Sequence, residues 1–118
     1  MGNEMKIEVM YFQGCPNHRP TVEQVQRALT AQGIVHGIEE IEIRDDGMAQ
    51  ALGFLGSPSV RVNGLDIEKD ARLGQSAGFG CRTYLDGDHR SGIPSVELIR
   101  LALVEAAGSG PEGESGRA

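Results

Sequence analysis

The feature that most constrains the fold is an apolar stretch near the start of the chain, at residues 6–12. Polar and apolar side chains alternate at its beginning, and from Val9 onward every side chain up to Phe12 is apolar. This pattern is typical of a strand that runs into the middle of a sheet, where neither face is open to water. We therefore expect the first strand here.

A helix is expected after this strand. Pro20 suits a first helical turn, because its missing N–H would have no helical partner there. Apolar residues then recur at helical spacing, at Val22, Val25 and Leu29. Gly33 is a stop signal. The helix should therefore run from about residue 16 or 20 to residue 32.

A second strand and a short helix follow in the prediction. Isoleucines interleave with acidic residues at 38–43, with a period of two over the last half, which favours a strand. Asp46 would cap a short helix that Gly53 or Gly56 closes.

The pair Asn63-Gly64 lies between two alternating segments, at residues 57–62 and 65–68. Both residues tolerate positive φ, so the pair predicts a two-residue hairpin. Residues 69–92 are rich in glycine, and only 81–84 looks extended. A loop of this length is either functional or contains an element that the pattern does not reveal.

Pro94 would open a last helix with a broad apolar row, which indicates a buried helix. Beyond Ala107 the chain is mostly glycine, serine and glutamate and has little to bury. We therefore expect one domain over residues 1–107 and a disordered tail over 108–118.

The charge of the chain limits its partners. The 118 residues carry a formal charge of -6, which argues against nucleic-acid binding, since that needs clustered Lys and Arg. The start of the chain lacks the apolar core of a secretion signal, and no apolar run approaches the ~20 residues of a membrane span. We therefore expect a cytoplasmic protein with no nucleic-acid or membrane partner.

The chain has two cysteines, Cys15 and Cys81. They are too few for the disulfide framework of a small secreted domain, and in a reducing cytosol they would be free thiols or would serve catalysis, redox switching or metal binding. Cys15 comes between the first strand and the first helix, where unpaired helix amides would stabilise a thiolate. The alternative is a buried cysteine that acts as a small apolar residue.

The order of these elements resembles the thioredoxin fold over roughly residues 6–105. The local motifs resemble a group of small stand-alone thioredoxin-like proteins, some of which are labelled as related to alkylmercury lyases. The motifs are Tyr11-Phe12-Gln13-Gly14-Cys15-Pro16-Asn17-His18, Gly56-Ser57-Pro58-Ser59-Val60-Arg61-Val62-Asn63-Gly64 and Cys81-Arg82-Thr83-Tyr84. The resemblance implies an α/β three-layer sandwich with a mixed four-stranded sheet in the order β-α-β-α-β-β-α.

The resemblance also implies roles for individual residues. Cys15 would be the nucleophile, and Pro58 would be a cis-proline that lies against it, whereas without the resemblance Pro58 is expected to be an ordinary trans turn proline, since only about one X-Pro bond in twenty is cis. The backbone of Ser57 would then lie beside the sulfur and pair with an extended thiol-bearing substrate. Two departures weaken the match to a dithiol oxidoreductase: His18 stands where the second cysteine belongs, and Gly14 replaces a tryptophan.

His18 and Cys81 each have several interpretations. His18 is either a solvated residue of the first helical turn or a partner of the Cys15 thiol. Cys81 is a distal resolving thiol, a second soft metal ligand beside Cys15, or a single buried strand cysteine. Two thiolates and His18 would suit zinc, copper(I) or mercury, although a paired Cys-x-x-Cys is missing.

Three functions are therefore compared. The first is a thioredoxin-like thiol protein without cofactor, a candidate thiol–disulfide oxidoreductase that acts on a thiol or disulfide of a protein or small molecule. The second is a binder of a soft metal ion, or an organomercurial-processing protein, that uses Cys15 and Cys81. The third is an interaction module that keeps the fold without its chemistry.

Overall fold

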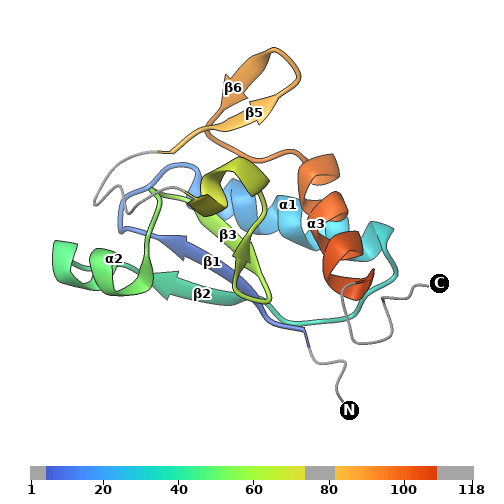
Figure 1. Ribbon diagram of the computed structural model, residues 1–118, viewed down its shortest axis with the longest axis horizontal. Coiled ribbons are helices and arrows are strands. Elements are labelled where there is room, and N and C mark those ends of the chain that lie inside the picture. Colours follow the sequence, from blue (N-terminus) through green and yellow to red (C-terminus); the bar gives the residue numbers. More distant parts are fainter. Residues whose placement is uncertain (1–4, 74–81, 109–118) are drawn as a thin grey trace.

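The structure is a computed structural model that describes residues 5–73 and 82–108 (Figure 1). Its main sheet is mixed and four-stranded, in the order β2-β1-β3-β4. The strands are β1 (Ile7–Tyr11), β2 (Glu39–Glu42), β3 (Ser59–Val62) and β4 (Leu65–Asp66). β2 is parallel to β1, and β3 is antiparallel to both β1 and β4. The predicted α/β class and mixed four-stranded sheet are confirmed.

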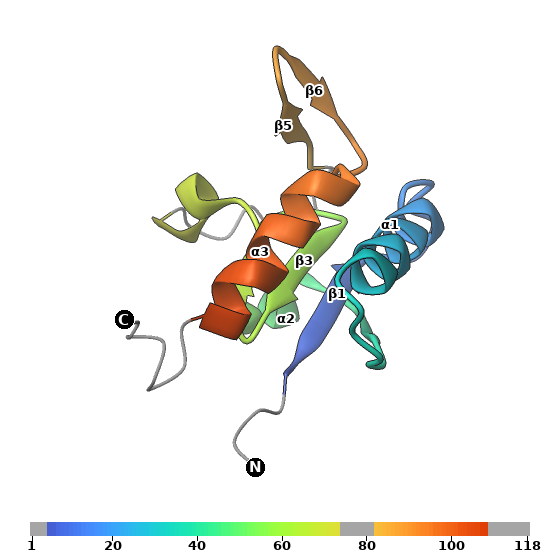
Figure 2. The same cartoon turned by 90° about the vertical axis from the view of Figure 1, so that its right-hand side faces the viewer.

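Helices cover both faces of this sheet. The helices α1 (His18–Ala31) and α3 (Val96–Gly108) contact each other on one face, and α2 (Asp46–Leu52) lies on the other (Figure 2). Alternate residues of β1 divide the core accordingly. Val9 belongs to the larger cluster with α1 and α3, whereas Met10 belongs to the smaller cluster with Ala49 of α2 and Phe54.

The helix boundaries have local causes. The Asp45 carboxylate accepts a hydrogen bond from the Met48 amide at 2.8 Å, so Asp45 caps α2 and the prediction of Asp46 is wrong by one residue. Gly53 closes α2 in the left-handed region at φ 65°. The Ser95 hydroxyl accepts from the Leu98 amide at the start of α3. α3 extends to Gly108, one residue beyond the predicted domain end, and residues 109–118 lie outside the described part.

The Asn63-Gly64 hairpin is confirmed. Both residues have positive φ, 55° and 83°, as a tight two-residue turn between β3 and β4 requires. The Asn63 carboxamide also accepts a hydrogen bond from the Lys6 amide at 2.8 Å, and the Asn63 amide donates to the Lys6 carbonyl. The turn is therefore fastened to the chain just before β1.

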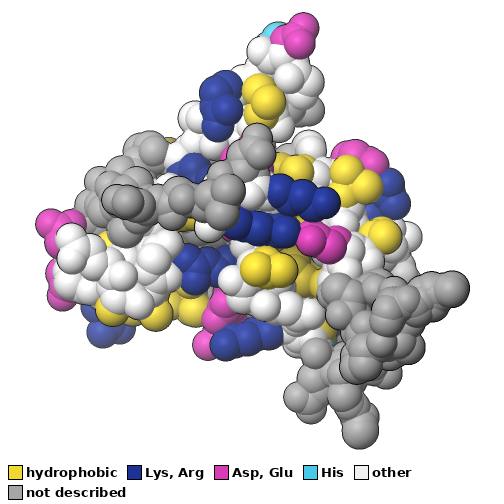
Figure 3. Space-filling view, viewed as in Figure 1, with side chains coloured by type: hydrophobic (Ala, Val, Ile, Leu, Met, Phe, Trp, Pro, Cys, Tyr) yellow, Lys and Arg dark blue, Asp and Glu magenta, His cyan; other side chains and the backbone are white. Residues whose placement is uncertain are grey.

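The glycine-rich region contains elements that the sequence pattern did not reveal. A 3-10 turn, η1 (Lys69–Leu73), follows β4, and β5 (Tyr84–Asp86) pairs with β6 (His89–Ser91) in a separate two-stranded sheet. This hairpin projects from the body of the molecule (Figure 1), and basic side chains gather on the face below it (Figure 3). Of the helices in the described part, none is both long and apolar enough to cross a membrane.

Candidate functional site

Cys15 lies in the turn that joins β1 to α1. Its amide donates to the Phe12 carbonyl at 3.2 Å, and Gly14 takes φ 90° to complete this turn. Cys15 is a free cysteine, partly exposed and outside both core clusters. The alternative of a cysteine buried as a small apolar core residue is therefore wrong.

Cys15 lies between β1 and α1, as predicted. α1 begins at His18 with Asn17 as its N-cap, so Cys15 lies three residues ahead of the first helical residue. The His18 amide donates to the Cys15 carbonyl at 3.3 Å. Within residues 5–73 and 82–108, the Cys15 sulfur has no hydrogen bond, so stabilisation of a thiolate by helix amides stays a prediction.

His18 contacts the sheet. Its ring stacks on Tyr11 at the end of β1, with ring centroids 3.6 Å apart and planes 5° from parallel. Its Nε2 lies 2.7 Å from Oε1 of Glu40 in β2, and its side chain is only 20% exposed. The described contacts include no hydrogen bond between His18 and Cys15 side chains. The His18 side chain therefore joins the start of α1 to β2.

Ser57 and Pro58 are brought to the Cys15 turn. The Ser57–Pro58 peptide bond is cis, as the resemblance implied. The buried Ser57 hydroxyl accepts a hydrogen bond from the Phe12 amide at 3.3 Å. Phe12 is also the residue whose carbonyl binds the Cys15 amide. The predicted proximity of the proline segment to the cysteine segment is thus supported through Phe12.

The Ser57 carbonyl already has a partner within the chain. It accepts a hydrogen bond from the Arg82 amide at 3.0 Å. We predicted that the Ser57 backbone would pair with an extended substrate. In the described structure the Ser57 carbonyl instead pairs with Arg82, in a segment that follows β4 in the sequence.

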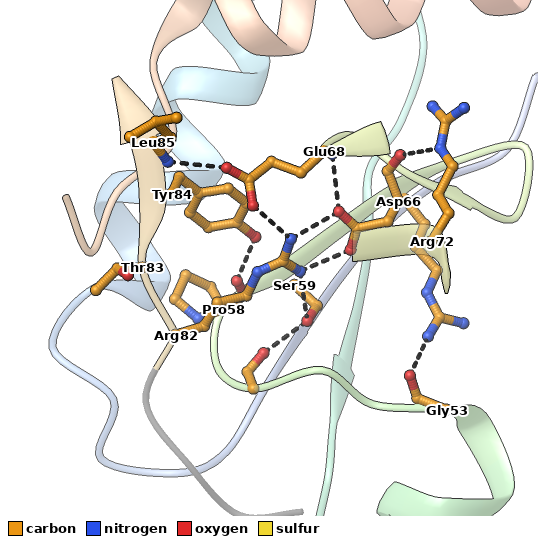
Figure 4. Close-up of polar contacts among 12 residues, drawn as sticks. Gly53, Pro58, Ser59, Asp66, Glu68, Arg72, Arg82, Thr83, Tyr84 and Leu85 are labelled. Atoms are coloured by element: carbon orange, nitrogen blue, oxygen red, sulfur yellow. Dashed lines mark hydrogen bonds and ion pairs between the residues drawn. The ribbon is translucent and has the colours of Figure 1, made fainter. Parts of the chain in front are cut away.

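Arg82 is the principal residue that sequence reasoning missed (Figure 4). Its guanidinium donates to both carboxylate oxygens of Asp66, at 2.6 and 2.7 Å, and to the Ser59 hydroxyl at 3.2 Å. Arg82 is 7% and Asp66 4% exposed. Burial alone would lower the pKa of Arg82, but the hydrogen bond to Asp66 and the surrounding negative charges raise it above its ordinary value. The pair is therefore a charged one.

Three further contacts stabilise the segment that begins at Arg82. The Arg82 guanidinium lies 4.2 Å from the centroid of the Tyr84 ring, and the Tyr84 hydroxyl donates to the Pro58 carbonyl. Burial raises the pKa of Tyr84 well above its ordinary value, so this hydroxyl stays a donor. The Glu68 carboxylate accepts from the Leu85 amide at 2.8 Å. We call residues 82–85 the strap.

A surface cavity of about 530 Å³ adjoins the Cys15 turn. Phe12 and Gln13 line it from the turn, and the residues at the end of β2 and just after it line it from the other side, namely Glu42, Ile43 and Arg44. Neither Glu42 nor Arg44 forms an ion pair with any described residue. The cavity therefore offers one negative and one positive side chain near the partly buried Phe12.

Two other predictions concern metal binding and Cys81. Cys81 lies outside the described residues, so its proposed roles stay predictions. In the part of the chain that the structure describes, no three His, Cys, Asp or Glu side chains group so as to hold a metal ion.

Comparison of the chain with protein-family models, with curated proteins and with solved structures finds no match.

Proposed function

We propose that the chain is a thioredoxin-like thiol protein in which Cys15 carries out thiol–disulfide exchange. The observation that supports this most is the hydrogen bond from the Phe12 amide to the Ser57 hydroxyl, which brings the Ser57–Pro58 segment to the turn that holds Cys15. The partial exposure of Cys15 and the mixed sheet with helices on both faces agree with the proposal.

The proposed reaction begins with the Cys15 thiolate. It attacks one sulfur of a disulfide, forms a mixed disulfide with that half, and releases the other half as a thiolate. A second thiol then attacks the Cys15 sulfur and releases the bound half. If Cys81 is that thiol, the protein ends with a Cys15–Cys81 disulfide and the substrate is reduced by two electrons. Two equivalents of an external low-molecular-weight thiol then reduce this disulfide by two successive exchanges, leave as their own disulfide, and return the protein to its dithiol form.

His18 does not supply the resolving thiol, although it occupies the place of the second cysteine in a Cys-x-x-Cys motif. Its contacts with Tyr11 and Glu40 give it a different part, which is to hold the start of α1, and with it the Cys15 turn, against the sheet. His18 is therefore proposed as a positioning residue for Cys15.

The reactivity of Cys15 tests the proposal. In Cys81→Ser, Cys15 is the single thiol, and its alkylation by iodoacetamide is followed by mass spectrometry from pH 5 to 10. We expect Cys15 to be alkylated faster than a model cysteine peptide at pH 7. Cys15→Ser, which leaves only Cys81, is the matched control. An alkylation rate equal to that of a model cysteine peptide would instead favour the interaction module.

A second experiment distinguishes the two candidate resolving thiols, Cys81 and an external thiol. The parent protein and Cys81→Ser are mixed with one equivalent of a small disulfide, without added thiol. If Cys81 resolves, the parent releases both halves and loses two hydrogens, while the variant stops at the mixed disulfide. If both proteins stop there, an external thiol is the resolving agent.

A further inference from the structure

Several main-chain groups around Cys15 are already paired within the chain. The Cys15 amide and carbonyl bind the Phe12 carbonyl and the His18 amide, the Phe12 amide binds the Ser57 hydroxyl, and the Ser57 carbonyl binds the Arg82 amide. An extended peptide is recognised mainly through free main-chain donors and acceptors. The Cys15 and Phe12 amides are therefore not available to pair with such a peptide, and the Cys15 and Ser57 carbonyls each already accept one hydrogen bond.

The hydrogen bond from the Arg82 amide to the Ser57 carbonyl is costly to break, because a buried ion pair anchors the strap. Its Arg82 side chain is bound to Asp66 by two hydrogen bonds, and both residues are more than nine-tenths buried. Separating a buried ion pair leaves charges without partners in a medium of low polarity, which is strongly unfavourable. A peptide would have to overcome this cost before it reached the Ser57 carbonyl.

The cavity next to the Cys15 turn offers recognition by side chains instead. Its volume of about 530 Å³ lies within the range of small-molecule pockets, which is roughly 300–1,000 Å³. Phe12, which is partly buried, provides apolar contact, while Arg44 and Glu42 provide opposite charges that no described residue neutralises. A ligand that matches this lining carries both a carboxylate and an ammonium group on a small framework.

We propose that Cys15 acts on low-molecular-weight disulfides of the amino-acid type, held in this cavity by Arg44 and Glu42, and not on extended polypeptides. This inference rests on the proposed thiol–disulfide exchange. The Cys15 thiolate attacks one sulfur of the symmetrical disulfide, forms a mixed disulfide with one half, and releases the other half as its thiolate, so that no further oxidant is required.

The test compares disulfides that differ in charge and size. Cys81→Ser protein is mixed with cystine, cystamine, 3,3′-dithiodipropionate or a disulfide that links two unstructured ten-residue peptides, and the rate of mixed-disulfide formation is measured by mass spectrometry. Each rate is divided by that of an unstructured cysteine peptide, which cancels the intrinsic reactivity of the disulfide. We expect the ratio for cystine to be the highest and the ratio for the peptide disulfide to be the lowest.

Charge variants in the same background identify the cavity. Arg44→Gln should lower the ratios for cystine and dithiodipropionate by about threefold, which is the size of an exposed ionic contact, and leave the ratio for cystamine unchanged. Glu42→Gln should lower the ratios for cystine and cystamine by a similar factor and leave that for dithiodipropionate unchanged. The control is Arg27→Gln, which removes an exposed positive charge from α1, outside the residues that line the cavity.

The outcomes distinguish the two proposals. If Cys15 reacts with no disulfide faster than the reference peptide does, the proposed thiol–disulfide exchange is wrong. If Cys15 reacts rapidly but the peptide disulfide matches cystine, or if neither charge variant changes the ratios, the exchange stands and the cavity is not its recognition site.

Discussion

The buried pair of Arg82 and Asp66 is expected to be essential for stability, and Arg82→Leu tests this. The substitution removes the guanidinium and leaves the Asp66 carboxylate buried, with the Glu68 amide, at 2.8 Å, as a remaining donor. Breaking a buried ion pair by removing one partner costs about 3–5 kcal/mol. Because one donor remains, we expect the lower end, about 3 kcal/mol of the free energy of unfolding.

A second variant distinguishes the cost of leaving the Asp66 charge buried without its partner from the cost of losing the Arg82 side chain. In Arg82→Leu combined with Asp66→Asn, no charge of the pair is left buried, and the carboxamide introduced at position 66 keeps an acceptor for the Glu68 amide. The double variant should therefore be more stable than Arg82→Leu alone by about 1–2 kcal/mol, although it carries one more substitution.

Urea unfolding followed by circular dichroism measures both effects. With a slope of about 1.5 kcal/mol/M, a loss of about 3 kcal/mol lowers the midpoint by about 2 M. The reasoning is refuted if Arg82→Leu shifts the midpoint by less than about 0.5 M at an unchanged slope, or if the double variant is less stable than the single one.

Three further variants test local contacts. The hydrogen bond from Arg72 holds the pKa of Glu105 below its usual value, so this contact stabilises the fold above the ordinary carboxyl pKa and is lost as the pH falls through the lowered one. At pH 7, Glu105→Gln should therefore lower the free energy of unfolding by up to about 1 kcal/mol, measured by urea unfolding. Near pH 2 the variant and the parent should be equally stable. A stability difference that is the same at both pH values contradicts this. The Thr21 hydroxyl is buried and has no hydrogen-bond partner among the described residues, so Thr21→Val should raise the melting temperature by an amount equivalent to about 1 kcal/mol, whereas a lower value would indicate a hidden partner. Asn63→Ala loses both the bond to Lys6 and a residue that tolerates φ 55°, so in thermal unfolding it should cost about 1 kcal/mol more than Asn63→Gly, which loses only the bond.

The elements that could be predicted are those with local causes. The Asn63-Gly64 turn depends on two adjacent residues that tolerate positive φ, and the first strand depends on a run of apolar side chains. Pro20 is the third residue of α1, still within the turn whose amides lack helical partners. The predicted start at residue 16 or 20 brackets the observed start at His18, because a proline is compatible with several positions in this turn and does not fix the first one.

The contacts that could not be predicted depend on tertiary structure. His18 reaches Glu40 only because β1 and β2 pair in the register that sets Val9 opposite Glu40. Arg82 is missed because arginine is usually exposed, and its partner Asp66 is sixteen residues earlier in the chain. The strap and the cavity likewise combine segments that no local pattern links.

The order of the sheet also bears on self-association. The strand β2 forms one edge, and its acidic residues are Glu39, Glu40 and Glu42. A second molecule that added its own β2 to this edge would bring like charges together and would be repelled. The opposite edge, β4, has only two residues and offers little length for pairing. Among the described strands, the main sheet therefore ends in two edges that discourage aggregation at neutral pH.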